Sequence, residues 1–208
     1  MKDWTGNKKS VFSTIGAMGH SKEERQNEDF YATDPIAIDK LEKSGIFDIP
    51  RKVWECSCGQ GHLSERLKEY GHEVFSTDIV DRNYGEKIID FLSFEADNFF
   101  DEIGGVDCII TNPPYKYTID FVLQALRLLK SGYACFLLKT TALESRGRYE
   151  KIFRNYPPLY VLQFIDRILC AKNGDFEYSK KFLGGGAQAY AWFVWEKGFK
   201  GRTTLGWI

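Results

Sequence analysis

Short apolar segments alternate with amphipathic ones along most of this chain, and no other feature of the sequence restricts its fold as strongly. Residues 133–138 form a continuous apolar run, which is typical of a strand buried on both faces of a sheet. Residues 118–129 instead repeat apolar side chains every three to four positions, as an amphipathic helix does. Because the connections are short and contain glycine, the alternation predicts an α/β fold with a mostly parallel sheet and helices on both faces.

The same alternation predicts the order of the elements. Seven strands are expected, at residues 51–56, 73–77, 87–89, 106–111, 133–138, 159–164 and 190–196. Helices are expected at residues 34–45, 62–70, 118–129 and 149–155. Asp34 and Pro35 favour the first helix start, because Asp caps free N–H groups and Pro loses no hydrogen bond in a first turn. Residues 1–28 are polar and aperiodic, so we expect a flexible N-terminal arm followed by a single domain over residues 29–208.

Composition is that of a soluble globular protein. The 208 residues are 43% hydrophobic and 27% charged, with a formal net charge of −1. The longest apolar run, residues 189–195, is far shorter than the roughly 20 residues of a membrane-spanning helix, and the N-terminus lacks the apolar stretch of a signal peptide. The five cysteines have no regular spacing, which argues against a disulfide framework or a metal site. We therefore expect a cytoplasmic protein with reduced cysteines and no bound metal.

Charged residues are unevenly distributed despite this overall balance. Every charged residue from Asp90 to Asp107 is acidic, whereas residues 139–154 and 167–181 are mostly basic. Ordinary solvation of loops and helix faces would explain each segment alone. The alternative is a basic rim that holds a phosphate backbone, and composition does not choose between the two.

Ligands of such sheets bind beyond the carboxyl ends of the strands, where the strand order reverses, so the residues after each strand matter most. The first strand is followed by a glycine turn, residues 55–61, which leads into a helix and can bring the backbone close to a ligand. Asp78 ends the second strand, where a carboxylate can accept both hydroxyls of a ribose. Asp90 and Phe91 follow the third strand and offer an acceptor for an adenine amino group and a ring to pack on the base.

The fourth strand is followed by Asn112, Pro113, Pro114 and Tyr115. The simplest interpretation is a rigid turn that ends the strand. The prolines also remove two backbone donors and fix φ, so together with the side-chain oxygen of Asn112 they form a surface of acceptors beside an aromatic ring. A planar amino group, with two N–H donors and a π face, matches that surface. The complete set of strand ends therefore indicates a functional site.

On these residues the chain resembles class I S-adenosylmethionine-dependent methyltransferases of the amino-methylating group that carries an Asn/Asp-Pro-Pro-Tyr/Phe signature. Small phage- or prophage-type DNA adenine-N6 methyltransferases are the most similar in appearance. The resemblance extends from Asp29 to the C-terminus and implies one Rossmann-like domain, S-adenosylmethionine as cofactor, DNA as substrate and the cytoplasm of a bacterial cell. The catalytic residues that it implies are Asn112, Pro113, Pro114 and Tyr115. The cofactor-binding residues that it implies are Tyr31, Thr33, Glu55, Cys56, Gly59, Gly61, Asp78, Asp90, Phe91 and Asn112.

The resemblance further implies direct transfer of a methyl group to a nitrogen. Asn112 Oδ1 and the Pro113 carbonyl would accept the two hydrogens of adenine N6, and Tyr115 would stack on the base. The target base has to be flipped out of a duplex, or unpaired, to reach this site. Candidate phosphate contacts are the basic residues expected near the same edge, namely Lys139, Arg146, Arg148, Lys172, Lys180 and Lys181.

Three other functions stay open from the sequence. The same acceptor surface suits the side-chain amide of glutamine in a release factor, although the helical domain that usually precedes such enzymes does not fit in roughly 50 residues. Adenine in RNA is a further substrate, and nothing in the sequence indicates contacts to a 2′-hydroxyl. The third alternative is a methyltransferase-fold module that binds without turnover. The presence of both Asn112 and Tyr115 argues against that module.

Overall fold

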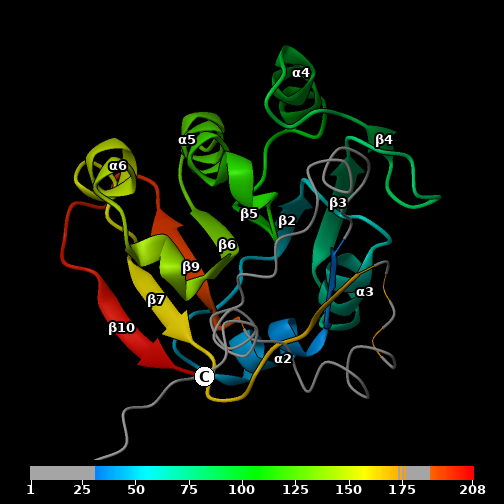
Figure 1. Ribbon diagram of the computed structural model, residues 1–208. Coiled ribbons are helices and arrows are strands. Elements are labelled where there is room, and N and C mark those ends of the chain that lie inside the picture. The colour runs from blue at the N-terminus through cyan, green and yellow to red at the C-terminus, as the bar shows by residue number, and fades with distance from the viewer. Residues whose placement is uncertain (1–30, 173, 175, 177–187) are drawn as a thin grey trace, which may run out of the picture.

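The computed structural model describes residues 31–172, 174, 176 and 188–208. The expected arm at residues 1–28 lies outside the described residues, as do Lys180 and Lys181. The described chain forms a central sheet with helices on both faces (Figure 1), which is the α/β architecture that the sequence predicts. None of the described helices is long and apolar enough to cross a membrane.

The central sheet has eight strands in the order β10-β7-β9-β6-β5-β2-β3-β4. They are β2 (Lys52–Glu55), β3 (Glu73–Asp78), β4 (Lys87–Ile88), β5 (Cys108–Thr111), β6 (Tyr133–Lys139), β7 (Tyr160–Gln163), β9 (Tyr190–Glu196) and β10 (Thr204–Trp207). Neighbouring strands are parallel except for β9, which runs antiparallel to both β6 and β7. All seven predicted strands are present, but the expected seven-stranded sheet is wrong by one strand. The addition is β10, an edge strand whose side chains are mostly exposed and lack the apolar pattern of a buried strand.

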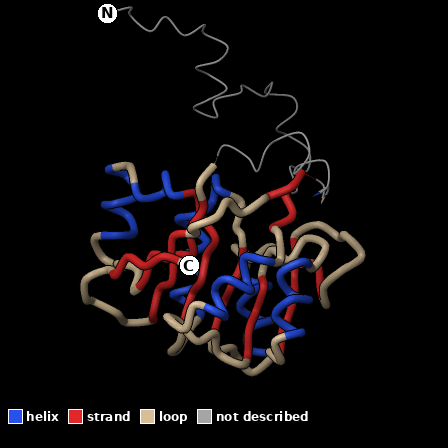
Figure 2. Tube along the Cα trace, turned by 90° about the horizontal axis from the view of Figure 1, so that it is seen from below, coloured by secondary structure: helices blue, strands red, loops and turns tan. Residues whose placement is uncertain are grey.

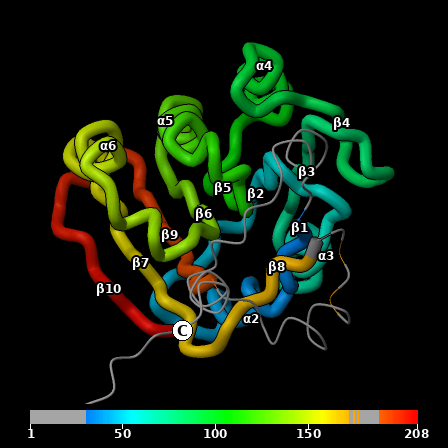
Figure 3. Tube along the Cα trace, viewed as in Figure 1, coloured from blue at the N-terminus to red at the C-terminus, as the bar shows by residue number. Residues whose placement is uncertain are grey.

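A separate antiparallel pair joins two short strands that the sequence does not predict. β1 (Tyr31–Thr33) pairs with β8 (Cys170–Lys172), and Thr33 lies opposite Cys170 in this register. Figure 3 shows the two strands side by side although they are far apart in sequence. A three-residue strand is too short for its pattern to be recognised, which explains why neither is predicted.

Alternating side chains of the buried strands support a layer of helices on each face of the sheet (Figure 2). On β2, Val53 packs in the same cluster as α2 (Ile36–Lys43) and α3 (His62–Glu69). The adjacent residue, Trp54, packs in the opposite cluster with α4 (Phe94–Glu102) and α5 (Thr118–Leu128). The period of two along the strand therefore divides the core between the two layers.

Two helical segments differ from the prediction. α4 lies inside the acidic segment, where no helix is predicted; Ser93 Oγ caps it by accepting the Glu95 N–H at 3.2 Å, and its apolar side chains are buried. The helix expected at residues 149–155 begins earlier, as α6 (Arg146–Arg148), and continues as the π-helical turn η3 (Tyr149–Phe153). Two 3₁₀ turns, η1 (Tyr115–Tyr117) and η2 (Thr140–Leu143), follow β5 and β6.

The ends of the parallel strands gather the predicted site residues at one edge of the sheet. β3 ends at Asp78, β5 ends one residue before Asn112, and β6 ends at Lys139. The antiparallel β9 begins at the same edge, where Tyr190 pairs with Lys139. The strand order reverses at β2, because the chain continues to β3 on one side and later to β5 on the other. This is the position at which sheets of this kind bind ligands.

Candidate active site

The side-chain amide of Asn112 is held in one orientation by the β1–β8 pair. Asn112 Nδ2 donates to Thr33 Oγ1 at 2.8 Å and to Cys170 Sγ at 3.8 Å. Thr33 and Cys170 are register partners in that pair, so one structural unit supplies both acceptors. The two bonds use the donor end of the amide and leave its oxygen directed elsewhere.

That oxygen, Asn112 Oδ1, is buried and has no hydrogen-bond partner among the described residues. A buried acceptor without a donor costs about 1–3 kcal/mol, and native structures contain few of them. The phenol oxygen of Tyr115, three residues later, is also buried, close to the polar side chains of Asn112, Cys170 and Tyr190. The Asn112 oxygen can therefore accept a hydrogen bond from a donor that the described residues do not supply.

The Tyr115 ring is positioned by side chains from the next two strands of the sheet. Its centroid lies 6.2 Å from that of Tyr190 with the rings 30° apart, and Lys139 Nζ lies 4.7 Å from it. Burial raises the pKa of the Tyr115 phenol, which stays protonated at neutral pH, and burial lowers the pKa of Lys139. The ring is thus already packed against protein. Tyr115 is nevertheless only half-buried, and its stacking on a target base stays a prediction.

Tyr190 and Cys170 are site residues that the sequence does not predict. Burial raises the pKa of the Cys170 thiol, which is therefore a neutral group beside the Asn112 amide. Both residues come close to the signature only through strand pairing, β6 with β9 for Tyr190 and β1 with β8 for Cys170. The apolar character of residues 190–196 could have placed Tyr190 at the start of a strand. The pairing of that strand with β6, which brings Tyr190 close to Tyr115, is not evident from the sequence.

The glycine turn after β2 is tied to the end of β3. Gly59 N–H donates to Asp78 Oδ2 at 2.8 Å, and Val80 N–H donates to Asp78 Oδ1 at 3.0 Å. Each carboxylate oxygen therefore keeps acceptor capacity for a further donor. Gly59 and Gly61 both have positive φ, of 56° and 83°, and a Cβ on Gly61 would overlap the ring of Tyr84. The turn brings the loop and the acid together, as the sequence predicts.

Side chains at the start of this turn are buried and do not reach the sheet edge. Glu55 is 2% exposed and accepts a hydrogen bond from Ser64 Oγ, which in turn lies 2.8 Å from Ser76 Oγ. Burial raises the pKa of Glu55 to about 8. Cys56 is equally buried, in the core under α4 and α5. Only backbone groups at these two positions are thus available to a ligand, and their role in cofactor binding stays a prediction.

Phe91 also lies in the core. Its ring is 2% exposed and packs against Trp54 at 5.3 Å and Phe121 at 5.0 Å between centroids. It is therefore not available to pack on a base, which corrects that part of the prediction. Asp90 is exposed beside it, and its Oδ1 accepts the Leu92 N–H at 2.9 Å. The carboxylate stays a candidate acceptor at the end of β4.

The remaining predicted residues are distributed as follows. Tyr31 is 37% exposed on β1, and Pro113 is buried whereas Pro114 is exposed. Arg146 is exposed and Arg148 half-buried, both in α6. Lys172 ends β8, and its side chain lies outside the described part, as do Lys180 and Lys181. The structure thus brings Thr33, Asn112, Tyr115 and Lys139 together, and separately joins Gly59 with Asp78 at the same edge.

Solved structures resemble the fold of this chain at low sequence identity. A "modification subunit of a putative type I restriction enzyme" from Vibrio vulnificus YJ016 aligns over 90% of this chain and 49% of its own, with a TM-score of 0.58 and 13% identity. A "putative hemolysin" from Lactococcus lactis aligns over 84% of this chain and 91% of its own, with a TM-score of 0.57 and 13% identity. A SAM-dependent methyltransferase from Archaeoglobus fulgidus aligns over 78% of this chain and 93% of its own, with a TM-score of 0.48 and 13% identity.

The chain has a Rossmann-like α/β fold, which the restriction subunit and the hemolysin share. The fold class predicted from the sequence is thereby confirmed. The chain spans about half the length of the Vibrio subunit, 49%. Neither a protein-family model nor a curated protein matches the sequence.

Proposed function

We propose that this protein transfers a methyl group from S-adenosylmethionine to an exocyclic amino nitrogen, namely N6 of an adenine in DNA. The observation that carries this proposal is the unpaired Oδ1 of Asn112. An amino group supplies the donor that this buried oxygen lacks. The intact signature from Asn112 to Tyr115 supports adenine N6 over other amines, because it combines acceptors with an aromatic ring.

The chemistry follows from the fixed orientation of the amide. The lone pair of adenine N6 is delocalised into the ring, so the ground-state nitrogen is a weak nucleophile. When Asn112 Oδ1 and the Pro113 carbonyl accept its two hydrogens, the nitrogen could pyramidalise and direct its lone pair at the methyl carbon. The carbon–sulfur bond would break as the carbon–nitrogen bond forms, with the electron pair left on sulfur, and the methylated nitrogen would then release one proton. These hydrogen bonds strengthen as positive charge develops on nitrogen, so they stabilise the transition state more than the ground state. The bond between Asn112 Nδ2 and Thr33 Oγ1 prevents the amide from turning its donor end to the substrate.

The groups on the β3 side of the edge suit the nucleoside part of the cofactor. The Asp78 carboxylate is held by two backbone N–H groups and keeps lone pairs for ribose hydroxyls. Exposed Asp90, at the end of the adjacent strand, can accept from an adenine amino group. S-adenosylmethionine supplies an electrophilic methyl group when it is bound. The protein contributes position, because the reacting atoms have to be aligned within a narrow range.

The proposal is tested by separating cofactor binding from transfer. Isothermal titration measures affinity for S-adenosylmethionine, and tritiated cofactor measures transfer to unmethylated DNA, to RNA and to a release factor. We expect transfer to DNA, reduced at least hundredfold in Asn112→Ala with cofactor affinity unchanged. Asp78→Ala should do the reverse and weaken cofactor binding first. The role of Asn112 is refuted if its alanine variant keeps more than about a tenth of wild-type turnover, a loss below about 1.4 kcal/mol.

The other substrates are outcomes of the same assay. Transfer only to RNA, or only to the glutamine of a release factor, would replace DNA as the substrate while keeping the chemistry at Asn112. Cofactor binding without transfer to any of the three would favour the non-catalytic binding module.

A further inference from the structure

A cavity of about 360 Å³ opens beside Tyr115, between the start of α5 and the segment that contains α6. Both segments follow strands that end at the active edge, β5 and β6, and Figure 1 shows α5 and α6 as neighbours. Asn112 does not line the cavity, so this space is distinct from the amide site and adjoins it through Tyr115. The lining residues are Tyr115, Lys116, Thr118, Ile119, Ser145, Gly147, Arg148 and Lys151.

Three cations and no carboxylate are found in the described lining of this cavity. Lys116 and Lys151 are exposed, and the described part of the chain shows no salt bridge for either. Arg148 is fixed at the rim, because its Nη1 donates to the carbonyls of Thr141 at 3.0 Å and Glu144 at 2.6 Å. The cavity is therefore a concentration of positive charge with one cation already ordered.

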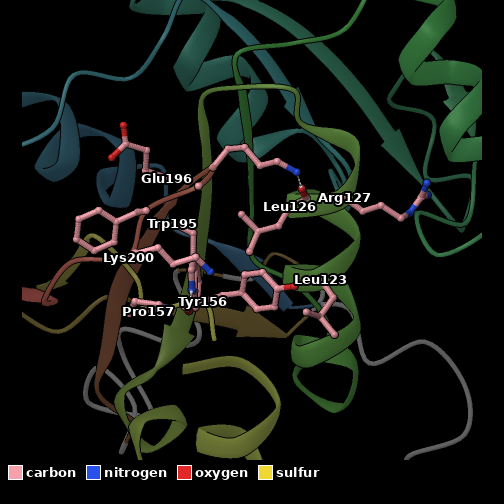
Figure 4. A pocket seen from close by; sticks show the side chains of 11 residues that line it. Leu123, Leu126, Arg127, Tyr156, Pro157, Trp195, Glu196 and Lys200 are labelled. Atoms are coloured by element: carbon pink, nitrogen blue, oxygen red, sulfur yellow. Dashed lines mark hydrogen bonds between the residues drawn. The ribbon is translucent and has the colours of Figure 1, made fainter. Parts of the chain in front are cut away.

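A second cavity, of about 290 Å³, shows the contrast (Figure 4). It also contains three cations, but all three are bonded to protein groups, whereas in the cavity beside Tyr115 Arg148 alone among the described cations is bonded in this way. Lys197 Nζ donates to the Leu126 carbonyl, Lys200 Nζ donates to the Asn155 carbonyl at 2.8 Å, and Arg127 pairs with Asp97. These bonds hold the end of α5 and the chain after η3 in place. The cations of that cavity therefore support the fold. Lys116 and Lys151 beside Tyr115 make no side-chain hydrogen bond or salt bridge within the described residues.

Backbone strain marks the cavity beside Tyr115. The backbone of Ser145 has φ 120° and ψ 122°, a conformation that residues other than glycine rarely adopt. It persists because Ser145 Oγ accepts the Arg148 N–H at 3.4 Å and the Ser145 carbonyl accepts the Tyr149 N–H at 3.0 Å. Strained residues cluster at ligand sites, where the surrounding structure maintains an otherwise unfavourable shape. Here the strained turn places Arg148 at the rim of the cavity.

We infer that this cavity binds a phosphodiester of the substrate DNA strand, next to the nucleotide whose base reaches Asn112. The inference rests on the proposed function, which puts a nucleotide at the signature, and it identifies where the backbone of that strand lies. A phosphate is an anion with several acceptor oxygens, which matches a fixed guanidinium and two exposed lysines, of which Lys116 only lies over the Tyr117 ring at 5.1 Å and Lys151 has no salt bridge among the described residues. Since a phosphate carries no sequence information, binding here positions the strand without selecting a target site.

The test uses the salt dependence of binding to a labelled single-stranded DNA that contains one adenine, followed by fluorescence anisotropy. Lys116→Gln and Lys151→Gln, alone and combined, remove charge from the cavity. Lys130→Gln is the matched control, because Lys130 is an exposed lysine between α5 and β6, at the opposite edge of the sheet. Arg148 is kept in every variant, since its bonds to two carbonyls give it a structural role.

Each cavity variant should weaken binding several-fold and reduce the steepness of log Kd against log salt by about 0.7 for each phosphate that the protein no longer neutralises. Lys130→Gln should leave both quantities at wild-type values. An unchanged slope in the double variant, or an equal fall in Lys130→Gln, overturns the inference. Binding that depends on the cavity for RNA but not for DNA also overturns it.

Failure of this inference is distinguishable from failure of the proposed function. Methyl transfer to DNA with wild-type salt dependence in the double variant would keep the function and reject the cavity. If the slope of log Kd against log salt falls in the cavity variants but no methyl transfer is detected, the phosphate site is supported and the transferase function is rejected. Cofactor affinity should stay constant in all the lysine variants, which shows that the fold is intact.

Discussion

Replacing Thr33 by valine tests the orientation of the Asn112 amide, the proposed catalytic group, without changing the amide itself. Valine matches threonine in shape but lacks the hydroxyl that accepts from Asn112 Nδ2 at 2.8 Å. Thr33 is 4% exposed, so water does not readily replace the missing acceptor. The weaker bond of Nδ2 with Cys170 Sγ at 3.8 Å is then the remaining restraint on the donor end.

The size of the effect follows from that single bond. A hydrogen bond of this kind contributes about 0.5–1.5 kcal/mol, and its loss leaves the two orientations of the amide close in energy. We therefore expect transfer to fall by up to about tenfold, because about 1.4 kcal/mol corresponds to a factor of ten. This is a smaller loss than the hundredfold or more expected for Asn112→Ala, which removes the acceptor altogether.

Single-turnover transfer of tritiated methyl to DNA at saturating cofactor measures the effect, and calorimetry checks cofactor affinity. Thr33→Ser is the control, since it restores the hydroxyl and should recover most of the rate. The reasoning is refuted if Thr33→Val stays within twofold of wild type, or if the serine variant is as slow as the valine variant.

Three further predictions concern stability and are measured by urea or thermal unfolding. Thr111→Val should stabilise the protein by about 1–2 kcal/mol, because Thr111 is fully buried and its hydroxyl has no partner among the described residues; a lower Tm would contradict this. Burial raises the pKa of Glu55 to about 8. The free energy of unfolding should therefore include the full contribution of protonated Glu55 below pH about 4.5, and this contribution should be lost as the pH rises through about 8. Glu55→Gln should abolish that loss, and parallel pH profiles for variant and wild type would rule the assignment out. Gly61→Ala should cost more than Gly45→Ala, for which positive φ alone predicts about 1–2 kcal/mol, because only at Gly61 does the added Cβ overlap the Tyr84 ring; equal costs would exclude the overlap.

Much of the fold was predictable because buried parallel strands carry continuous apolar runs and amphipathic helices repeat at their own period. The apolar run at residues 133–138 forms β6, and the pattern at residues 118–129 forms α5. β10 escaped prediction because an edge strand with exposed side chains has no such pattern. α4 escaped because its many acidic residues leave only a few apolar side chains to indicate the face that it buries.

The sequence predicted which edge of the sheet carries the candidate site. It did not predict the direction in which each side chain points. Asn112 and Asp78 follow strands whose carboxyl ends must meet, so their common edge was predictable. Phe91 occupies an equivalent position, yet its ring turns into the core against Trp54. Tyr190 was not predictable, because its packing on Tyr115 depends on the register of two strands separated by about fifty residues in the chain.

The β1–β8 pair gives the Asn112 side chain a support that does not belong to the main sheet. An isolated ribbon of two strands is marginally stable in water, so these three-residue strands should open locally at a lower free-energy cost than the buried strands of the central sheet. Such an opening would free the Asn112 amide to rotate while the eight-stranded sheet stayed intact. A small molecule that separates Thr33 from Cys170 would therefore inhibit the proposed transferase without competing with the cofactor or the target base.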